Sequence, residues 1–231
     1  MPTTVHVLRV FTDPNGNHGN PLGVVLDATG LDDARRQAIA AQLGFSETVF
    51  VENVSRAELR IFTPTQELPL AGHPLVGASW LLSQVTGAEV PTLRPLRASA
   101  EVDTWLEDGL TWIRARIDDA PPWAFVQLGT PKDIEALTVP PAPEYDLHEF
   151  WAWQDEAAGR LRARVFVSRY GIAENEATGS GAIRLIEALR RPFVITQGRG
   201  SILHARPAPD ASQAEIGGSV VEDAIKRLDE T

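Results

Sequence analysis

A histidine stands at the start of a predicted helix, in the segment Ala71-Gly72-His73-Pro74. Apolar residues follow it at helical spacing, whereas the prolines and the glycine before it exclude a helix there. Free amides at a helix N-terminus attract an anion, and Gly72 allows a ligand to approach the backbone closely. Because Pro74 has no N–H, the donors must come from His73 and Leu75. The segment indicates an anion site, and the alternative is a histidine that only caps the helix.

A second glycine-led helix start follows in residues 174–182, ahead of an amphipathic pattern. Laid on the first segment, Gly179 falls on Gly72 and Ser180 falls on His73, because 179 − 72 = 107 and 180 − 73 = 107. Two helix starts that face one cleft would hold a small anionic molecule from both sides. Chance similarity over so few positions is the alternative to two related halves.

Glu47 lies where a helical pattern ending at Gly44 gives way to the strand-like run Thr48 to Glu52. This position gives the carboxyl group apolar neighbours on both sides. A carboxyl group screened from water can remove a proton from carbon and return it. Residue type alone favours a simpler interpretation, a solvated or amide-bonded carboxylate at the beginning of a strand.

Length, composition and charge restrict the function classes. The 231 residues, 43% of them hydrophobic, can form one large domain or two small ones. A net charge of −10 and the absence of a wide Lys/Arg cluster argue against a nucleic-acid partner. The absence of cysteine excludes disulfides, thiolate metal sites and a thiol nucleophile. No targeting segment or long apolar run is recognisable, so we expect a cytoplasmic protein without a membrane partner.

The hydrophobic pattern is rich in strands and poor in helices. Strands are expected at residues 5–11, 22–26, 48–52, 57–63, 92–96, 102–106, 110–117, 145–153, 161–167, 193–196, 201–205 and 214–221. Helices are expected from Asp32 or Asp33 to Gly44, from the Gly-His-Pro step, and after Gly179. Proline-rich loops fall at 118–122 and 140–143, and the tail at 222–231 is expected to be a short helix. A boundary near residue 100 would divide the chain into 1–100 and 101–231.

Five segments, taken in this order, resemble the PhzF-like family of phenazine biosynthesis. They are Asn20-Pro21, Ser46-Glu47-Thr48, the run from Phe62 to Pro74, Ala177-Thr178-Gly179-Ser180 and Gln197-Gly198-Arg199. The resemblance spans nearly the whole chain. It implies a diaminopimelate-epimerase-like α+β fold with two pseudo-symmetric domains, each a curved, mostly antiparallel sheet wrapped around a central helix. It also implies a site in the cleft between them, a homodimer and no cofactor.

The resemblance also implies roles for individual residues. Glu47 matches the family's catalytic glutamate, and burial in an apolar cleft would raise the pKa of its carboxyl group toward the working pH. His73 would bind substrate or assist the proton movement, and Gly179 and Ser180 would hold a substrate carboxylate. The best-known member of the family moves a proton within a cyclohexadiene carboxylate that bears hydroxyl and amino groups. We therefore expect a cofactor-independent isomerase of a small carboxylate, in which Glu47 is the acid and base.

Two other function classes remain open at this point. The protein could bind a small anionic metabolite without converting it, in which case it would have no use for a buried acid at Glu47. A metal hydrolase is less well supported, because His73 has no companion histidine at ligand spacing. Glu67 and Glu174 are expected to be structural and to accept hydrogen bonds from backbone amides in their loops.

The segment Glu174-Asn175-Glu176 departs from the family, which usually has Glu-Asp-Pro there. The family's aspartate would accept hydrogen bonds from a substrate amine, and Asn175 offers no full charge to such a group. We therefore expect a substrate with a neutral, hydrogen-bond-accepting group in place of the amine. Glu176 replaces a proline, so a shifted loop could bring its carboxylate into the cleft instead.

Overall fold

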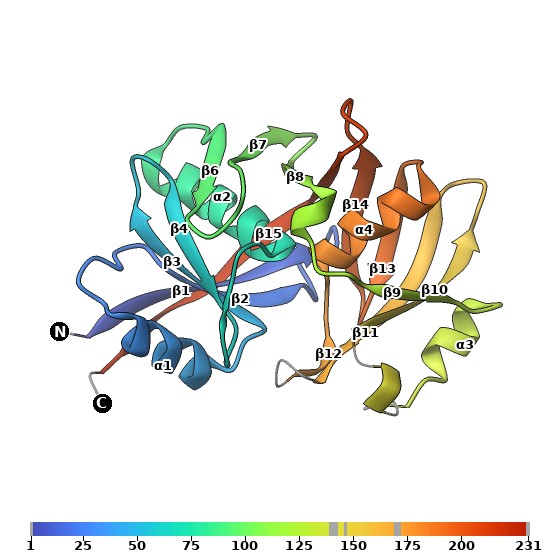
Figure 1. The fold of residues 1–231 in the computed structure, drawn as a ribbon, viewed down its shortest axis with the longest axis horizontal. Coiled ribbons are helices and arrows are strands. Elements are labelled where there is room, and N and C mark those ends of the chain that lie inside the picture. Colours follow the sequence, from blue (N-terminus) through green and yellow to red (C-terminus); the bar gives the residue numbers. More distant parts are fainter. Residues whose placement is uncertain (1, 139–142, 146, 169–171, 230–231) are drawn as a thin grey trace.

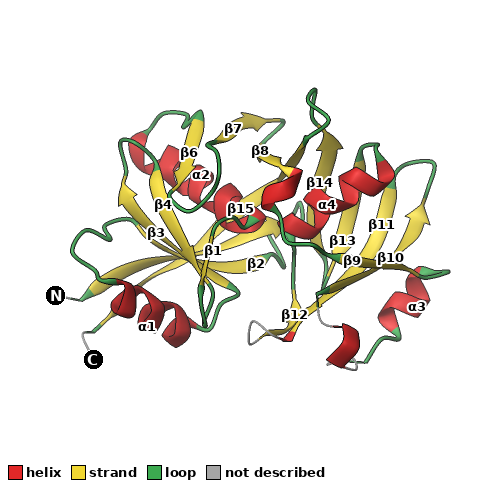
Figure 2. Cartoon of the chain, in the orientation of Figure 1, coloured by secondary structure: helices red, strands yellow, loops and turns green. Residues whose placement is uncertain are grey.

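The computed structural model describes residues 2–138, 143–145, 147–168 and 172–229. Strands dominate these residues and helices are few, which is the predicted α+β class (Figures 1 and 2). The strands are β1 (Thr3–Thr12), β2 (Asn20–Val25), β3 (Glu47–Asn53), β4 (Glu58–Phe62), β5 (Glu67–Leu68), β6 (Thr92–Pro95), β7 (Val102–Glu107), β8 (Leu110–Arg116), β9 (Ala124–Gln127), β10 (His148–Asp155), β11 (Arg160–Val167), β12 (Ile172–Asn175), β13 (Phe193–Gln197), β14 (Ser201–Pro207) and β15 (Gln213–Leu228). The helices are α1 (Asp33–Leu43), α2 (Gly72–Thr86), α3 (Pro131–Glu135) and α4 (Gly179–Leu189), with the short 3₁₀-helices η1 (Ile117–Asp119) and η2 (Pro143–Tyr145). The predicted loop at 140–143 lies mostly outside the described residues.

Hydrogen-bonded strands pack against each of the two buried helices, α2 and α4. Strands β1-β2-β3-β4-β6-β7-β8-β15 follow one another, and β15 pairs again with β1, so this path closes. Helix α2 packs on β1, β2, β3, β8 and β15 of this path. From β15 the sheet continues through β14, β13, β11 and β10 to β9, and α4 packs on β14 and β15. Most pairings are antiparallel, as predicted, whereas the division into two pseudo-symmetric domains remains a prediction.

The tail at 222–231 was expected to be a helix, but its residues up to Leu228 belong to strand β15. Residues up to Gly218 pair with β8 or β14, and residues Ser219 to Leu228 pair with β1. A short, charged helix would have little apolar surface to bury, whereas the open edge of β1 provides a backbone hydrogen-bond ladder. Tertiary pairing therefore decides the structure of this segment, which carries the chain back beside its N-terminus (Figure 1).

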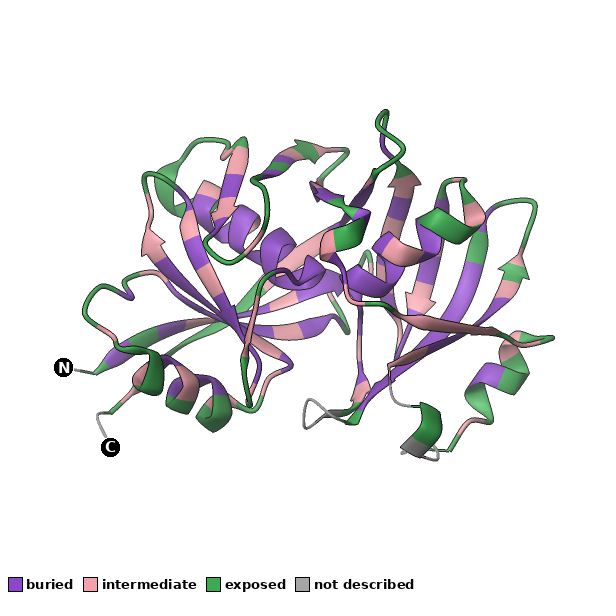
Figure 3. Cartoon of the chain, viewed as in Figure 1, coloured by how far each residue is buried: buried purple, intermediate pink, exposed green. Residues whose placement is uncertain are grey.

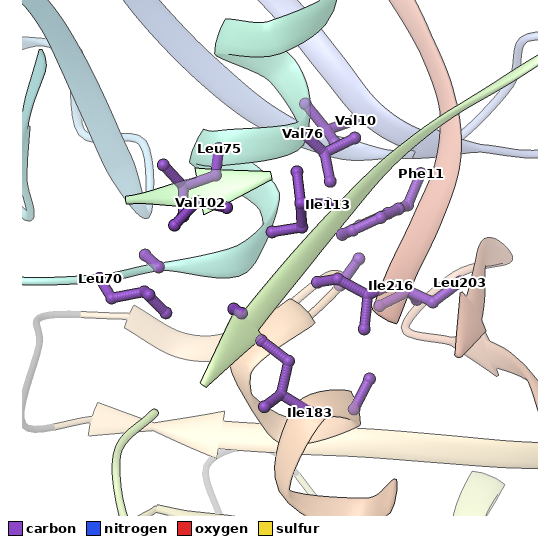
Figure 4. Close-up of a cluster of buried hydrophobic side chains, with 14 of the residues drawn as sticks. Val10, Phe11, Leu70, Leu75, Val76, Val102, Ile113, Ile183, Leu203 and Ile216 are labelled. Carbon is purple, nitrogen blue, oxygen red and sulfur yellow. The ribbon is translucent and has the colours of Figure 1, made fainter. Parts of the chain in front are cut away.

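The core lies under the first turns of α2 and α4, where both helices are buried on nearly all sides (Figure 3). Figure 4 shows Leu75 and Val76 of α2, Ile183 of α4 and Ile216 of β15 within one apolar cluster. This packing explains the absence of a polar stripe on the buried part of α2. Shared packing of this kind fixes the relative position of the two helix starts.

Glu149 lies on β10, and its carboxyl group is buried under the first turn of α4. It is fully buried, and neither carboxyl oxygen has a hydrogen-bond partner among the described residues. The carboxyl group packs closely against Gly181, where an added Cβ atom would displace Glu149 Oε2 from its position. Burial raises the pKa of Glu149 to about 8.

This raised pKa predicts a pH-dependent stability. Below its ordinary pKa of 4.5 the Glu149 carboxyl group is protonated in both the folded and the unfolded state. As the pH rises from there toward about 8, this group ionises in the unfolded state but stays protonated in the folded state, which favours unfolding. The free energy of unfolding should therefore fall between about pH 5 and pH 8, with a slope of at most about 1.4 kcal/mol per pH unit from this one proton. Glu149→Gln should flatten the decline in urea unfolding across this range, and the exposed Glu187→Gln on α4 should not. An unchanged decline in Glu149→Gln would contradict the prediction.

Candidate active site

The two predicted helix starts meet in the structure through their glycines. A Cβ atom built on Gly72 would lie 2.7 Å from Gly179 Cα, and one built on Gly179 would lie 2.8 Å from Gly72 Cα. Ile216 Cδ1 would be equally close to both added atoms. Only glycine at both positions allows this approach of backbone to backbone. The residues that match each other in sequence, 107 positions apart (179 − 72), thus touch in space.

This contact predicts a large effect of one added methyl group. Gly72→Ala should destabilise the fold by about 1–3 kcal/mol, because the neighbouring atoms of Gly179 are backbone and cannot rotate away. The unfolding free energy from urea denaturation measures the effect. Gly129→Ala is the matched control, because a Cβ there meets only Asp133 Oδ2, at 3.4 Å. Equal stability of the two variants would show that the helix starts are not in contact.

Glu47 and His73 lie together at this junction. Glu47 is the first residue of β3 and its side chain is 12% exposed, while His73 is the second residue of α2 and its side chain is 3% exposed. His73 Nδ1 lies 3.5 Å from Glu47 Oε2. Neither Glu47 Oε2 nor His73 Nε2 has a hydrogen-bond partner among the described residues. Unpartnered polar atoms at such depth point to a role beyond structure.

Burial changes the acidity of both side chains. It raises the pKa of Glu47 to about 7, and the hydroxyl group of Ser46 opposes this shift. Burial also lowers the pKa of His73 to about 3, against a smaller opposite effect of the Pro21 backbone. Near neutral pH the carboxyl group can therefore both take up and release a proton, while the imidazole stays uncharged.

Asn20 connects this pair to the second half of the chain. Its side-chain amide nitrogen donates to Asn175 Oδ1 at 2.7 Å and to Ala177 O at 2.8 Å, and it lies 3.4 Å from His73 Nδ1. Its carbonyl oxygen accepts from the Ser46 hydroxyl at 3.0 Å. Asn20 was not among the predicted site residues, although Asn20-Pro21 belongs to the family pattern.

Asn175 uses its oxygen internally. Oδ1 accepts from Asn20 Nδ2 and, at 3.2 Å, from the backbone amide of Ala177. The Asn175 side-chain NH₂ group makes no hydrogen bond to any described residue. Asn175 borders the cavity described below, so it can offer donors to a ligand but has little accepting capacity left.

Leu75 requires a correction. It was expected to offer a free amide, but its N–H donates to Ala71 O at 3.3 Å and the residue is fully buried. Helix α2 begins at Gly72, within the predicted Gly-His-Pro step, and Ala71 is its N-cap, so Leu75 makes the first hydrogen bond within the helix. The helix amides without such a partner are those of Gly72 and His73.

The start of α4 presents Gly179 and Ser180 as predicted, both buried. Thr178 is the N-cap, and its backbone amide donates to Gln197 Oε1 at 3.1 Å. Gln197 Nε2 donates in turn to the Thr178 hydroxyl and to Asn175 O, each at 3.0 Å. Gln197 therefore fixes the backbone that leads into the helix, which leaves the amides of the first turn of α4 to a ligand.

A small cavity opens at the junction of these elements. It is lined by Glu47, Leu68, Leu70, Ala71, Gly72, His73, Pro121, Trp123, Val167, Asn175, Thr178, Gly179 and Ser180. It thus brings together the predicted site residues apart from Leu75. Pro121 and Trp123 are additions, since nothing in the sequence pattern around Pro121-Pro122 indicates more than a loop.

Ion pairs hold the three other glutamates considered in the sequence, Glu67, Glu174 and Glu176. Glu67 and Glu174 were expected to bond to backbone amides, but each pairs with an arginine through both carboxyl oxygens, Arg60 and Arg164 respectively, at 2.7–2.8 Å. Glu176 was considered as a substitute carboxylate for the cleft. Its oxygens accept from the Arg199 backbone amide, the Arg199 guanidinium group and the Ser201 hydroxyl at 2.9–3.1 Å, and it does not line the cavity.

No three histidine, aspartate or glutamate side chains of the described residues converge as metal ligands. None of the helices in this part of the chain has the length and apolar character required to cross a lipid bilayer.

Comparison with known proteins agrees with the resemblance. A family model described as "Phenazine biosynthesis-like protein" matches residues 8–104. The trans-2,3-dihydro-3-hydroxyanthranilate isomerase of Pseudomonas fluorescens is 30% identical over 253 residues, which cover 88% of this chain and 91% of that protein. An uncharacterized isomerase of Pasteurella multocida is 46% identical over 87 residues, but this match covers only 36% of this chain and 30% of that protein. The crystal structure of a Bacillus anthracis phenazine biosynthesis protein of the PhzF family superposes with a TM-score of 0.81 at 20% identity and covers 99% of both chains, which establishes the shared fold.

Both relatives are named isomerases. The chain belongs to the phenazine biosynthesis-like (PhzF) family.

Proposed function

We propose that the protein moves a proton between two carbon atoms of a small carboxylate and that Glu47 is the acid and base. The observation that carries this proposal is the buried Glu47 carboxyl group at the cavity. Its Oε2 has no hydrogen-bond partner among the described residues, and His73 Nδ1 lies 3.5 Å away. A pKa of about 7 supports both directions of transfer near neutral pH.

The proposed step is redox neutral. The Glu47 carboxylate takes a proton from a substrate carbon, and the electron pair of that C–H bond moves into the adjacent π system. The resulting carboxylic acid then gives the proton to another carbon of the same π system, so that Glu47 regains its charge. One proton and one double bond have changed position, and no electrons have left the substrate. Neutral His73 can stabilise the intermediate by a hydrogen bond.

The helix starts would hold the substrate's carboxylate. The amides of Gly179, Ser180 and Gly181 precede the first intrahelical bond of α4, which Ala182 makes to Thr178 O at 3.1 Å. The amides of Gly72 and His73 play the same part on α2. Both helix dipoles point their positive ends at the cavity, so a carboxylate or another oxygen would be favoured there.

Asn175 defines the other end of the substrate. Because its oxygen accepts from Asn20 and Ala177, only its NH₂ group remains for the ligand. A substrate ammonium group would meet donors without an acceptor, which is unfavourable in a buried site. The substrate should therefore present a hydroxyl or carbonyl oxygen to Asn175. This differs from the substrate named for the Pseudomonas fluorescens relative, since an anthranilate skeleton carries an amine.

A panel of unsaturated carboxylates incubated in D₂O tests the proposed function. Trans-2,3-dihydro-3-hydroxyanthranilate and its analogue with a hydroxyl group in place of the amine belong in this panel. Proton NMR should detect isomerisation, with solvent deuterium at the receiving carbon, for the hydroxyl compound and little or none for the amine. Turnover of neither compound, together with binding of both, would contradict the proposal and favour a binding protein.

A further inference from the structure

The segment from Ala120 to Trp123, here called the strap, lies against the first two turns of α4. Arg184 donates to Ala120 O at 2.8 Å and to Pro121 O at 3.3 Å. Trp123 Nε1 donates to Ser180 Oγ at 3.1 Å. Ser180 and Arg184 are four residues apart on the helix and so lie on the same face. In Figure 1, the segment that joins η1 to β9 passes the start of α4.

The bond between Trp123 and Ser180 has only one possible direction. The indole N–H can donate and cannot accept, so the oxygen of the Ser180 hydroxyl group must be the acceptor. The hydroxyl hydrogen of Ser180 therefore remains available, and Ser180 makes no other side-chain hydrogen bond to a described residue. Ser180 is 8% exposed and lines the cavity together with Trp123. A buried donor at the positive end of a helix favours an acceptor, above all an anionic one.

We propose that Trp123 is a positioning residue that holds the Ser180 hydroxyl group as a donor and thereby makes the cavity select a carboxylate over its neutral carboxamide. Without the indole N–H, the hydroxyl group can rotate and present its lone pairs to the cavity, where they repel a carboxylate. The binding of a carboxamide depends less on the orientation of the Ser180 hydroxyl group, because a carboxamide offers both an acceptor and a donor and can pair with either orientation. The inference rests on the proposed anion site and extends it to a residue on the strap.

The experiment measures binding and needs no turnover. Benzoate and benzamide serve as probes of equal shape, and isothermal titration gives their dissociation constants for wild type, Trp123→Phe, Ser180→Ala and the double variant. Trp123→Phe should weaken the binding of benzoate about three- to tenfold, because part of one charge-assisted hydrogen bond is lost. The dissociation constant of benzamide should change less than twofold. In the Ser180→Ala background, the same change should have less than a twofold effect on benzoate, because Trp123 acts through Ser180.

The matched control is Trp105→Phe. Trp105 also donates its indole N–H to an oxygen, Glu107 Oε2 at 3.0 Å, but lies away from the cavity. This variant should bind both probes as wild type does. Equal weakening of benzoate and benzamide, or an undiminished effect of Trp123→Phe in the Ser180→Ala background, would reduce Trp123 to a packing role and overturn the inference. Failure of wild type to prefer benzoate would overturn it as well.

These outcomes are separate from those of the proposed function. If the protein binds benzoate with the expected coupling but isomerises no carboxylate, the role of the strap stands and the proposed proton shift is refuted. If it isomerises carboxylates but shows no coupling between Trp123 and Ser180, the proton shift stands and the role of the strap is refuted.

Discussion

Glu47→Gln should abolish turnover while leaving folding and ligand affinity nearly unchanged. The amide matches the carboxyl group in shape but cannot accept and return a proton. Removal of an acid–base group costs on the order of 10² to 10⁴ in rate. We expect a loss of this size in kcat, with less change in KM, because the group acts mainly in the transition state.

Steady-state kinetics on the compound that wild type isomerises measures this loss, and the urea-unfolding midpoint verifies the fold. The exposed Glu187→Gln on α4 is the control for removing one negative charge and should keep wild-type kinetics. Activity of Glu47→Gln within tenfold of wild type would show that another group moves the proton.

Asn175→Asp should give the protein activity toward an aminated substrate. One oxygen of the new carboxylate can keep the bonds from Asn20 Nδ2 and the Ala177 amide, and the other replaces the NH₂ group that faces the ligand. A charge-assisted bond to an ammonium group is roughly twice as strong as a neutral one, so kcat/KM for the aminated cyclohexadiene carboxylate should rise by about tenfold or more. The same change should lower kcat/KM for the hydroxyl analogue, which loses a donor.

Asn175→Ala is the control that separates the effect of the added negative charge from the effect of removing the amide group. It removes the donor without adding an acceptor, so it should give no gain with the aminated compound. Efficient conversion of that compound by wild type would refute the substrate assignment, and so would an equal gain in Asn175→Ala.

The sequence allowed the local features of the site to be predicted, because they depend on short-range patterns. Glycine and proline restrict where α2 and α4 can begin, and the end of α1 at Gly44 places Glu47 at the first position of β3. The strand-rich fold with few helices follows from the same periodicities. The contact between Gly72 and Gly179 agrees with the alignment of the two segments.

The missed features depend on contacts between distant residues. Asn20 meets Asn175 across 155 positions of sequence, and no local pattern indicates that its amide would occupy the oxygen of Asn175. Trp123 enters the cavity from a segment whose prolines suggest only a loop. The arginine partners of Glu67 and Glu174 lie on neighbouring strands, and such cross-strand pairs depend on strand order. The Leu75 amide was expected to be free, but Leu75 is the fourth residue of the helix and its amide donates to the carbonyl group of the N-cap.

The pH dependence of kcat/KM tests the central claim, that Glu47 is the acid and base, most directly. Because Glu47 must begin as a carboxylate, kcat/KM should rise with pH along a limb with an apparent pKa of about 7, while His73 stays neutral across the range. Glu47→Asp should move this limb, since the carboxyl group then sits at a different depth. A profile that is flat from about pH 5 to pH 9, or a limb that Glu47→Asp leaves unmoved, would contradict the account.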